Sequence, residues 1–214
     1  HEPVKLTPEN ANRLVFVGSF IHEPNVDAMR HFCSNVLPLI AEAVPEVSLR
    51  IIGNAPPPEI AQLASGRVEV LGYVAETKPF LETSAVSIAP LRFGAGMKGK
   101  IGEAMSFGLP VVTTTVGVEG FGLTPGKDVL VGNTPEAFAQ AVVSLLRDKA
   151  LWAKVGASGF EFIRDNYSEP VVRRAVYRLF DGVGAYPVKR IKTFRLLRRK
   201  LATLVERHLS WRMK

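Results

Sequence analysis

Two lysines follow a glycine-rich segment in the middle of the chain, within the sequence PLRFGAGMKGKIGEAMSFGLPVVT of residues 90–113. Gly94 and Gly96 leave little side-chain bulk, so the backbone of this segment can approach a ligand closely. A helix is predicted just after these glycines, and the N–H groups at a helix start attract anions. Lys98 and Lys100 add positive charge at the same place. The pattern predicts a loop that holds phosphate groups.

Glu103 lies about one turn into this helix, which we expect to begin near Met97 or Lys98. A carboxylate there can accept hydrogen bonds from both hydroxyls of a vicinal diol such as a ribose. The helix is predicted to end at Gly108, before a buried apolar strand. A phosphate loop with a ribose acceptor just inside it indicates a nucleotide site. The alternative is a glycine loop with a solvated helix start in an ordinary α/β protein.

Short apolar runs alternate with helical segments along the rest of the chain. Buried strands are predicted at residues 13–19, 47–53, 67–74, 85–90 and 111–112, and near 128–131. Helices are predicted at residues 26–43, 76–84, 134–148, 149–166 and 169–183. A further short helix is predicted after the prolines at 56–58, and it ends at residue 64. This alternation predicts an α/β fold with a doubly wound parallel sheet. The glycine loop would lie at the carboxyl ends of the strands, where such sheets bind ligands.

The motif K-x-x-E-A-M-x-x-G-x-P-V-V, which begins at Lys100, resembles the C-terminal half of GT-B glycosyltransferases, in particular the retaining family 4 (group 1) enzymes. The resemblance covers residues 13–168, the span of one Rossmann-like domain. It implies that the domain binds a nucleotide-sugar donor, which is a substrate, and we expect no cofactor. In the family, the Glu before Ala-Met binds the donor's ribose, and this position is Glu103, followed by Ala104. We therefore expect Lys100 and Glu103 to carry the domain's share of catalysis.

The same resemblance implies further donor contacts. The family's domain opens with a strand whose following turn faces the donor's phosphates, which places Gly18 and Ser19 there. Asn25 is another candidate, although capping the first long helix is the commoner role for such a residue. In the family, the segment after the third strand lies beside the nucleotide base, which would bring Tyr73 and Val74 near it. Tyr73 is equally well explained as a packing residue.

Two features depart from the common family pattern. Many members carry an earlier Glu eight residues upstream, where this chain has Ala95, and an Arg and a Lys soon after the first strand. The segment GSFIHEPNVDAMRHF lacks such a pair, so Lys100, with Lys98 in reserve, would stabilise the charge of the diphosphate. Two alternatives remain open: a non-catalytic nucleotide-sugar-binding module, and one half of a GT-B-type sugar-nucleotide epimerase.

Length and composition narrow the remaining possibilities. A complete two-domain enzyme would need nearly twice the 214 residues, so we expect the acceptor-binding N-terminal domain to be missing. The one cysteine, Cys33, excludes an intramolecular disulfide, and we expect it in the core. His22 and His31 have no metal-ligand neighbours and the chain has no D-x-D, so no metal site is predicted. No bilayer-spanning run or signal peptide is visible, which predicts a cytoplasmic protein.

Positive charge is concentrated at the end of the chain. The chain has a net charge of +7, whereas residues 189–214 contain ten Lys or Arg and one Glu, so the rest is slightly acidic. Apolar residues recur there at helical spacing: Phe194, Leu197, Leu201, Leu204, Val205 and Leu209. Such a basic amphipathic helix favours an anionic membrane surface, where a glycan or lipid-linked acceptor would be close, or a partner groove; packing on its own domain is the alternative. Nucleic acid is not an expected partner, because no recognition motif accompanies the charge.

The predicted organisation therefore has four parts. Residues 1–12 form a linker or boundary segment, and residues 13–168 form the nucleotide-sugar-binding domain. Residues 169–188 form a helix and a connection, and residues 189–214 form the basic tail. A tail of this kind would place the protein in the cytoplasm, peripherally at the inner face of the membrane.

Overall fold

The computed structural model describes residues 3–183, except for the side chains of residues 181–183. It contains two units, of which the first extends to Ser168 and the second begins at Glu169. The basic tail predicted at residues 189–214 lies outside the described residues.

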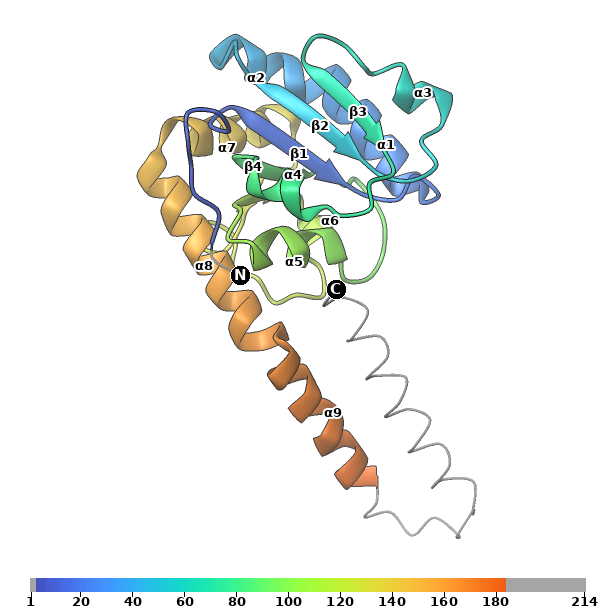
Figure 1. Cartoon of the computed structure of the whole chain (residues 1–214), viewed down its shortest axis with the longest axis vertical. Helices are drawn as coiled ribbons and strands as arrows, with labels where there is room; N and C mark the ends of the chain where they lie inside the picture. The colour runs from blue at the N-terminus through green and yellow to red at the C-terminus, as the bar shows by residue number, and fades with distance from the viewer. Residues whose placement is uncertain (1–2, 184–214) are drawn as a thin grey trace. The chain divides into compact units, whose positions relative to one another are not determined.

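The described part of the first unit is built on one six-stranded parallel sheet (Figure 1). Its strands are β1 (Arg13–Val17), β2 (Ser48–Ile52), β3 (Val68–Gly72), β4 (Val86–Ala89), β5 (Val111–Thr113) and β6 (Leu130–Val131). They lie in the order β3-β2-β1-β4-β5-β6. The sheet thus grows outward from β1 in one direction and from β4 in the other, which confirms the predicted doubly wound fold. In such sheets ligands bind beyond the carboxyl ends of the strands where the order reverses, here between β1 and β4.

Helices cover both faces of this sheet. They are α1 (Glu23–His31), the π-helical η1 (Phe32–Val36), α2 (Leu37–Ala43), α3 (Pro58–Ala61), α4 (Lys78–Glu82), α5 (Gly99–Ser106), α6 (Thr115–Val118), α7 (Pro135–Arg147) and α8 (Lys149–Tyr167). The segments α1, η1 and α2 form a continuous stretch that packs with α7, whereas α5 packs with α8 (Figure 1). Because both faces are covered, β4 and β5 are buried along their whole length. The loop that follows β4 therefore starts from a rigid position.

Two helices that follow one another near the end of the first unit begin as the sequence indicates. Thr134 accepts a hydrogen bond from the Ala137 N–H at the start of α7, and Asp148 accepts from two N–H groups at the start of α8. The indole N–H of Trp152, in the first turn of α8, donates to the carbonyl of Ala85 at 2.6 Å. This bond joins α8 to the start of β4.

The prediction of one long helix at residues 26–43 is wrong in two respects. The helix begins earlier, at Glu23, and the π-helical segment η1 interrupts it. Pro38 has no N–H to donate to the carbonyl of Ser34, four residues back, so the regular α-helical bonding is broken there. The π-helical turn η1 lies just before this proline. Asn25 is consequently in the first turn of α1 and does not cap it, because His22 occupies the cap position. The short helices α3 and α4 also end earlier than predicted.

The second unit is described as far as α9 (Glu169–Val183), which has the bounds that the sequence predicts. Arg173 pairs with Glu169 one turn earlier. Val172, Tyr177 and Leu179 are exposed apolar side chains on this helix. Of the helices within residues 3–183, none combines the length and the apolar character that crossing a bilayer requires.

Candidate functional site

The loop between β4 and α5, residues 90–98, lies at the carboxyl edge of the sheet. Gly94 and Gly96 have φ angles of 121° and 78°, a region that other residues rarely adopt. Arg92 donates hydrogen bonds to both carboxylate oxygens of Asp27 on α1, which lowers the pKa of that carboxyl group. The glycine loop is therefore fixed to the helix that follows β1.

The turn after β1 forms the other side of the switch point. The Gly18 N–H donates to the carbonyl of Ile52 at 2.9 Å. A Cβ on Gly53 would lie 1.8 Å from the carbonyl oxygen of Gly18, so no larger residue fits there. The Ser19 carbonyl accepts a hydrogen bond of 2.6 Å from Nδ2 of Asn25. The turn is thus held from both sides, by the end of β2 and by α1.

Lys100 lies in the first turn of α5 and connects the two sides of the site. Its ammonium donates to Oδ1 of Asn25 and lies 4.3 Å from the centroid of the Phe16 ring. A Cβ on Gly18 would come within 2.7 Å of Nζ. Burial, and to a smaller extent the charge of Lys98, lowers the pKa of Lys100 to about 7. Among the described residues this cation has no carboxylate partner, so it is available to an anion at the switch point.

Lys98 has a different position, although it is only two residues away. Its Nζ donates to the carbonyl of Gly96 at 2.5 Å and to that of Gly94 at 3.2 Å, and it lies 4.0 Å from the carboxylate of Glu119. The Lys98 side chain is only 9% exposed, whereas that of Glu119 is 57% exposed. Lys98 therefore braces the glycine loop, and Glu119 is a loop acid that supports it.

Glu103 lies in α5, one turn after Lys100, and is half-buried. Its Oε1 accepts a hydrogen bond from the hydroxyl of Thr77, which immediately precedes α4. Among the described residues, Oε2 has no hydrogen bond or ion pair. The carboxylate predicted to bind ribose is thus held at one oxygen, and its other oxygen is available.

The remaining predicted donor contacts divide into exposed and buried residues. Tyr73 follows β3 and is 75% exposed, so it is not a packing residue. Val74 is half-buried and packs against the core. Ala104 is fully buried and its methyl group lies in the core, so its side chain does not face the site. Asn25 is also buried, with both ends of its amide occupied by Ser19 and Lys100. These contacts indicate that Asn25 orients the Lys100 side chain.

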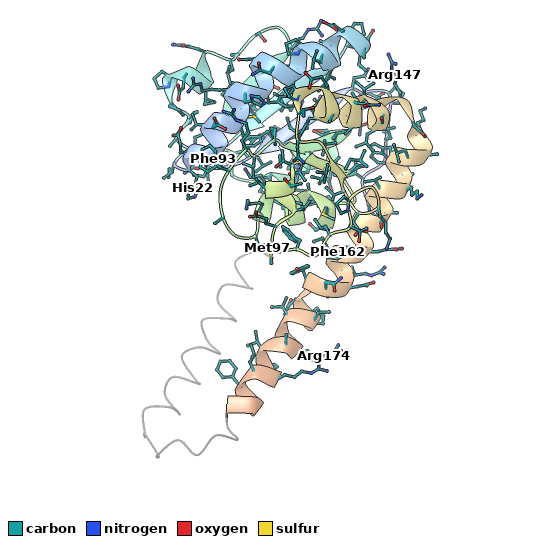
Figure 2. All side chains as sticks on the ribbon, turned by 180° about the vertical axis from the view of Figure 1, so that it is seen from behind. His22, Phe93, Met97, Arg147, Phe162 and Arg174 are labelled. Carbon is teal, nitrogen blue, oxygen red and sulfur yellow. The ribbon has the colours of Figure 1, made fainter. Side chains whose placement is uncertain are left out.

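Sequence reasoning missed several residues at this edge. Thr77 and the ion pair of Arg92 with Asp27 carry no local signal, because their partners are distant in the chain. Phe93 and Met97 were not predicted to face the site, although both project from the glycine loop and are about half exposed (Figure 2). Apolar residues within a turn-rich segment were the available signal for these two.

The family model described as glycosyl transferases group 1 matches residues 11–148. The chain belongs to this family. The matched residues include the turn after β1, the glycine loop after β4, Lys100 and Glu103. The predicted resemblance is confirmed.

Three similar proteins extend this comparison. An uncharacterized 44.6 kDa protein in the cps region of Klebsiella pneumoniae is 24% identical over 184 residues, which are 81% of this chain and 47% of that protein. The phosphatidyl-myo-inositol mannosyltransferase of Mycobacterium leprae is 26% identical over 157 residues, 70% of this chain and 42% of that protein. A mutant of TarM from S. aureus, in a crystal structure with Fondaparinux, alpha-GlcNAc-glycerol and UDP, has a TM-score of 0.68 at 18% identity. That match covers 83% of this chain and 37% of TarM.

The chain thus spans less than half the length of each of these proteins. The likeness to TarM establishes a shared fold. Within residues 3–183, no three His, Cys, Asp or Glu side chains are grouped so as to hold a metal ion. Donor binding without a metal remains a prediction.

Proposed function

We propose that this chain is the donor-binding domain of a retaining glycosyltransferase, and that it binds a nucleotide-diphosphate sugar at the β1–β4 switch point. One observation carries the proposal. The ammonium of Lys100 and the carboxylate of Glu103 lie one turn apart on α5, beside the glycine loop and the Gly18 turn. A cation for the diphosphate and an acceptor for the ribose are therefore at the place where doubly wound sheets bind ligands.

The diphosphate is assigned to Lys100, the glycine loop and the start of α5. The first N–H groups of a helix have no partners within the helix and carry a partial positive charge, which favours a bound anion. A diphosphate beside Lys100 would supply the counter-charge that its buried ammonium lacks in the described residues. Anion binding should therefore raise the pKa of Lys100 from about 7 and be accompanied by proton uptake near neutral pH.

In the transfer step the domain contributes positioning and electrostatic stabilisation. Negative charge grows on the diphosphate as the bond to the sugar breaks, and the Lys100 ammonium and loop amides would stabilise that charge. The acceptor site is assigned to a separate N-terminal domain, since the chain covers less than half the length of the Klebsiella pneumoniae and Mycobacterium leprae relatives. This chain alone should bind the donor and transfer sugar poorly.

The comparisons support the classes of substrate. The TarM crystal structure includes UDP, and the Mycobacterium leprae relative is named as a mannosyltransferase of phosphatidyl-myo-inositol. The Klebsiella pneumoniae relative is named as a protein in the cps region. We assign to this chain a nucleotide-sugar donor and a glycan or lipid-linked acceptor in polysaccharide biosynthesis, with membrane attachment through the basic tail.

Titration calorimetry with UDP, GDP, ADP and dTDP and their sugars tests the proposal. Glu103→Ala should weaken binding of the preferred nucleotide on the order of tenfold or more, because a hydrogen bond to a charged group contributes roughly 1.5–3 kcal/mol. Circular dichroism should show an unchanged fold. Failure of the intact chain to bind any of the nucleotides would contradict the proposal, as would full affinity in the Glu103→Ala variant.

A further inference from the structure

Thr77 makes a contact that its position in the chain does not account for. It occupies the N-cap position of α4, where a threonine side chain ordinarily accepts a hydrogen bond from a backbone N–H of its own helix. Here the hydroxyl makes no capping bond and donates instead to Oε1 of Glu103. Its orientation is thus determined by a residue of another helix, 26 positions away.

The bond changes what the carboxylate of Glu103 can do. A free glutamate side chain has several rotamers, and ordering it on ligand binding costs conformational entropy. The Thr77 hydroxyl holds Oε1 before any ligand arrives, and it occupies one acceptor position of that oxygen. Oε2 and the second lone pair of Oε1 stay available within the described part of the chain. A carboxylate held in this way matches a vicinal diol in a single orientation.

We propose that Thr77 is a positioning residue for Glu103, and that the pair selects ribonucleoside diphosphates over their 2′-deoxy counterparts. This inference rests on the proposed function, because it deepens the role of Glu103 in donor binding. A 2′-deoxyribose leaves one held acceptor of the carboxylate without a donor, and a site built for a hydroxyl rejects the analogue that lacks it. The donor of this chain is therefore a ribonucleotide sugar and not a dTDP-sugar.

The experiment measures binding of UDP, GDP and ADP and of 2′-deoxy-UDP, 2′-deoxy-GDP and 2′-deoxy-ADP to the whole chain by calorimetry. The readout is the affinity ratio of each ribonucleotide to its 2′-deoxy form, because a loss of general stability affects both forms alike. For the base that binds best, the wild-type ratio should be roughly tenfold or more. Glu103→Gln should bring the ratio close to one.

Thr77→Val removes the hydroxyl and keeps the shape of the side chain. It should lower the ratio about two- to tenfold, the effect of releasing one side chain that must be ordered again on binding. Affinity for the 2′-deoxy form should fall less, because only its 3′-hydroxyl still uses the carboxylate. Thr77→Ser keeps the hydroxyl and should retain the wild-type ratio. Thr83→Val is the matched control, since the Thr83 hydroxyl lies just beyond the other end of α4 and donates to the Pro79 carbonyl.

The outcomes separate the two proposals. A wild-type ratio in Thr77→Val, combined with loss of the ratio in Glu103→Gln, would overturn the role of Thr77 and leave the ribose anchor intact. Equal losses in Thr77→Ser and Thr77→Val would also overturn it, because packing and not the hydroxyl would then be responsible. A wild-type ratio near one, unchanged in Glu103→Gln, would instead contradict the ribose contact of the proposed function. Thr77→Ala supplies the same comparison if the valine variant does not fold.

Discussion

Replacing Lys100 by methionine should stabilise the unliganded protein at pH 6 and remove its stabilisation by UDP. Lys100 is a buried cation without a carboxylate partner in the described residues, and burial is the main cause of its low pKa. Methionine has a similar length and no charge, and its sulfur can contact the Phe16 ring that now lies under the ammonium. The substitution removes the free-energy cost of burying the charge. It also removes the ammonium that is assigned to the diphosphate.

The magnitude follows from the pKa. A decrease from the ordinary value of 10.5 to about 7 corresponds to roughly 5 kcal/mol of differential free energy between the two protonation states. The Phe16 ring returns about 1–2 kcal/mol to the cation, and an unpaired Asn25 amide oxygen in the variant costs about 1–3 kcal/mol. We therefore expect Lys100→Met to be more stable than the wild type by about 2 kcal/mol at pH 6.

The pH dependence has a definite sign. Below about pH 7 both the folded and the unfolded states bind the Lys100 proton, so the full cost of the buried charge is present. Between about 7 and 10.5 the folded state has released this proton while the unfolded state retains it, so the stability contributed by Lys100 rises with pH. The advantage of Lys100→Met should decrease by roughly 1.4 kcal/mol per pH unit across that window, so it should vanish at about pH 8.5 and the wild type should be the more stable protein at pH 10.

Urea unfolding of the wild type and Lys100→Met at pH 6, 8 and 10, with and without UDP, measures these differences. UDP should stabilise the wild type and leave Lys100→Met unchanged. Lys98→Met is the control, because Lys98 bonds loop carbonyls and lies near Glu119, and its loss should destabilise the protein at pH 6. The reasoning would be refuted if Lys100→Met were less stable than the wild type at pH 6. It would also be refuted if the difference in unfolding free energy between the two proteins were the same at all three pH values.

Three further predictions concern the glycine turn, the second lysine and the tail. Gly53→Ala should destabilise the protein by about 3 kcal/mol or more in thermal or urea unfolding, because its Cβ would lie 1.8 Å from a backbone oxygen; Gly66→Ala, with open space around it, should be nearly neutral. Lys98→Ala should weaken UDP binding less than Lys100→Ala in calorimetry, and equal effects would contradict the ranking. Deleting residues 189–214 should abolish co-sedimentation with anionic vesicles and leave UDP affinity intact; an intact chain that ignores such vesicles excludes the membrane role.

Much of the fold could be predicted because its signals are local. Strands buried on both faces are largely apolar runs, so β1, β4 and β5 stand out in the sequence. The start of α7 could be read from Thr134 and Pro135, which act within one turn of the helix. The interruption at η1 could not, since a proline near the middle of a helical pattern can kink, end or widen the helix.

The sequence alone determined which residues could form the site. Gly94 and Gly96, two lysines and Glu103 are close in the chain, and a loop that leads into a helix holds such residues together in any context. It also determined that a parallel sheet would present this loop at its carboxyl edge. These are properties of neighbours along the chain and of the helix and strand periods.

Only the tertiary structure decided the roles within that set. The strand order places β1 beside β4, which brings Asn25 to Lys100 across 75 positions of the chain and Asp27 to Arg92 across 65. Thr77 reaches Glu103 from a different helix in the same way. Lys100 is therefore the cation that Asn25 holds at the switch point and Lys98 the brace of its loop, although both are lysines two residues apart. The physical reason is that burial and partners, which set the charge and orientation of a side chain, depend on which strands become neighbours.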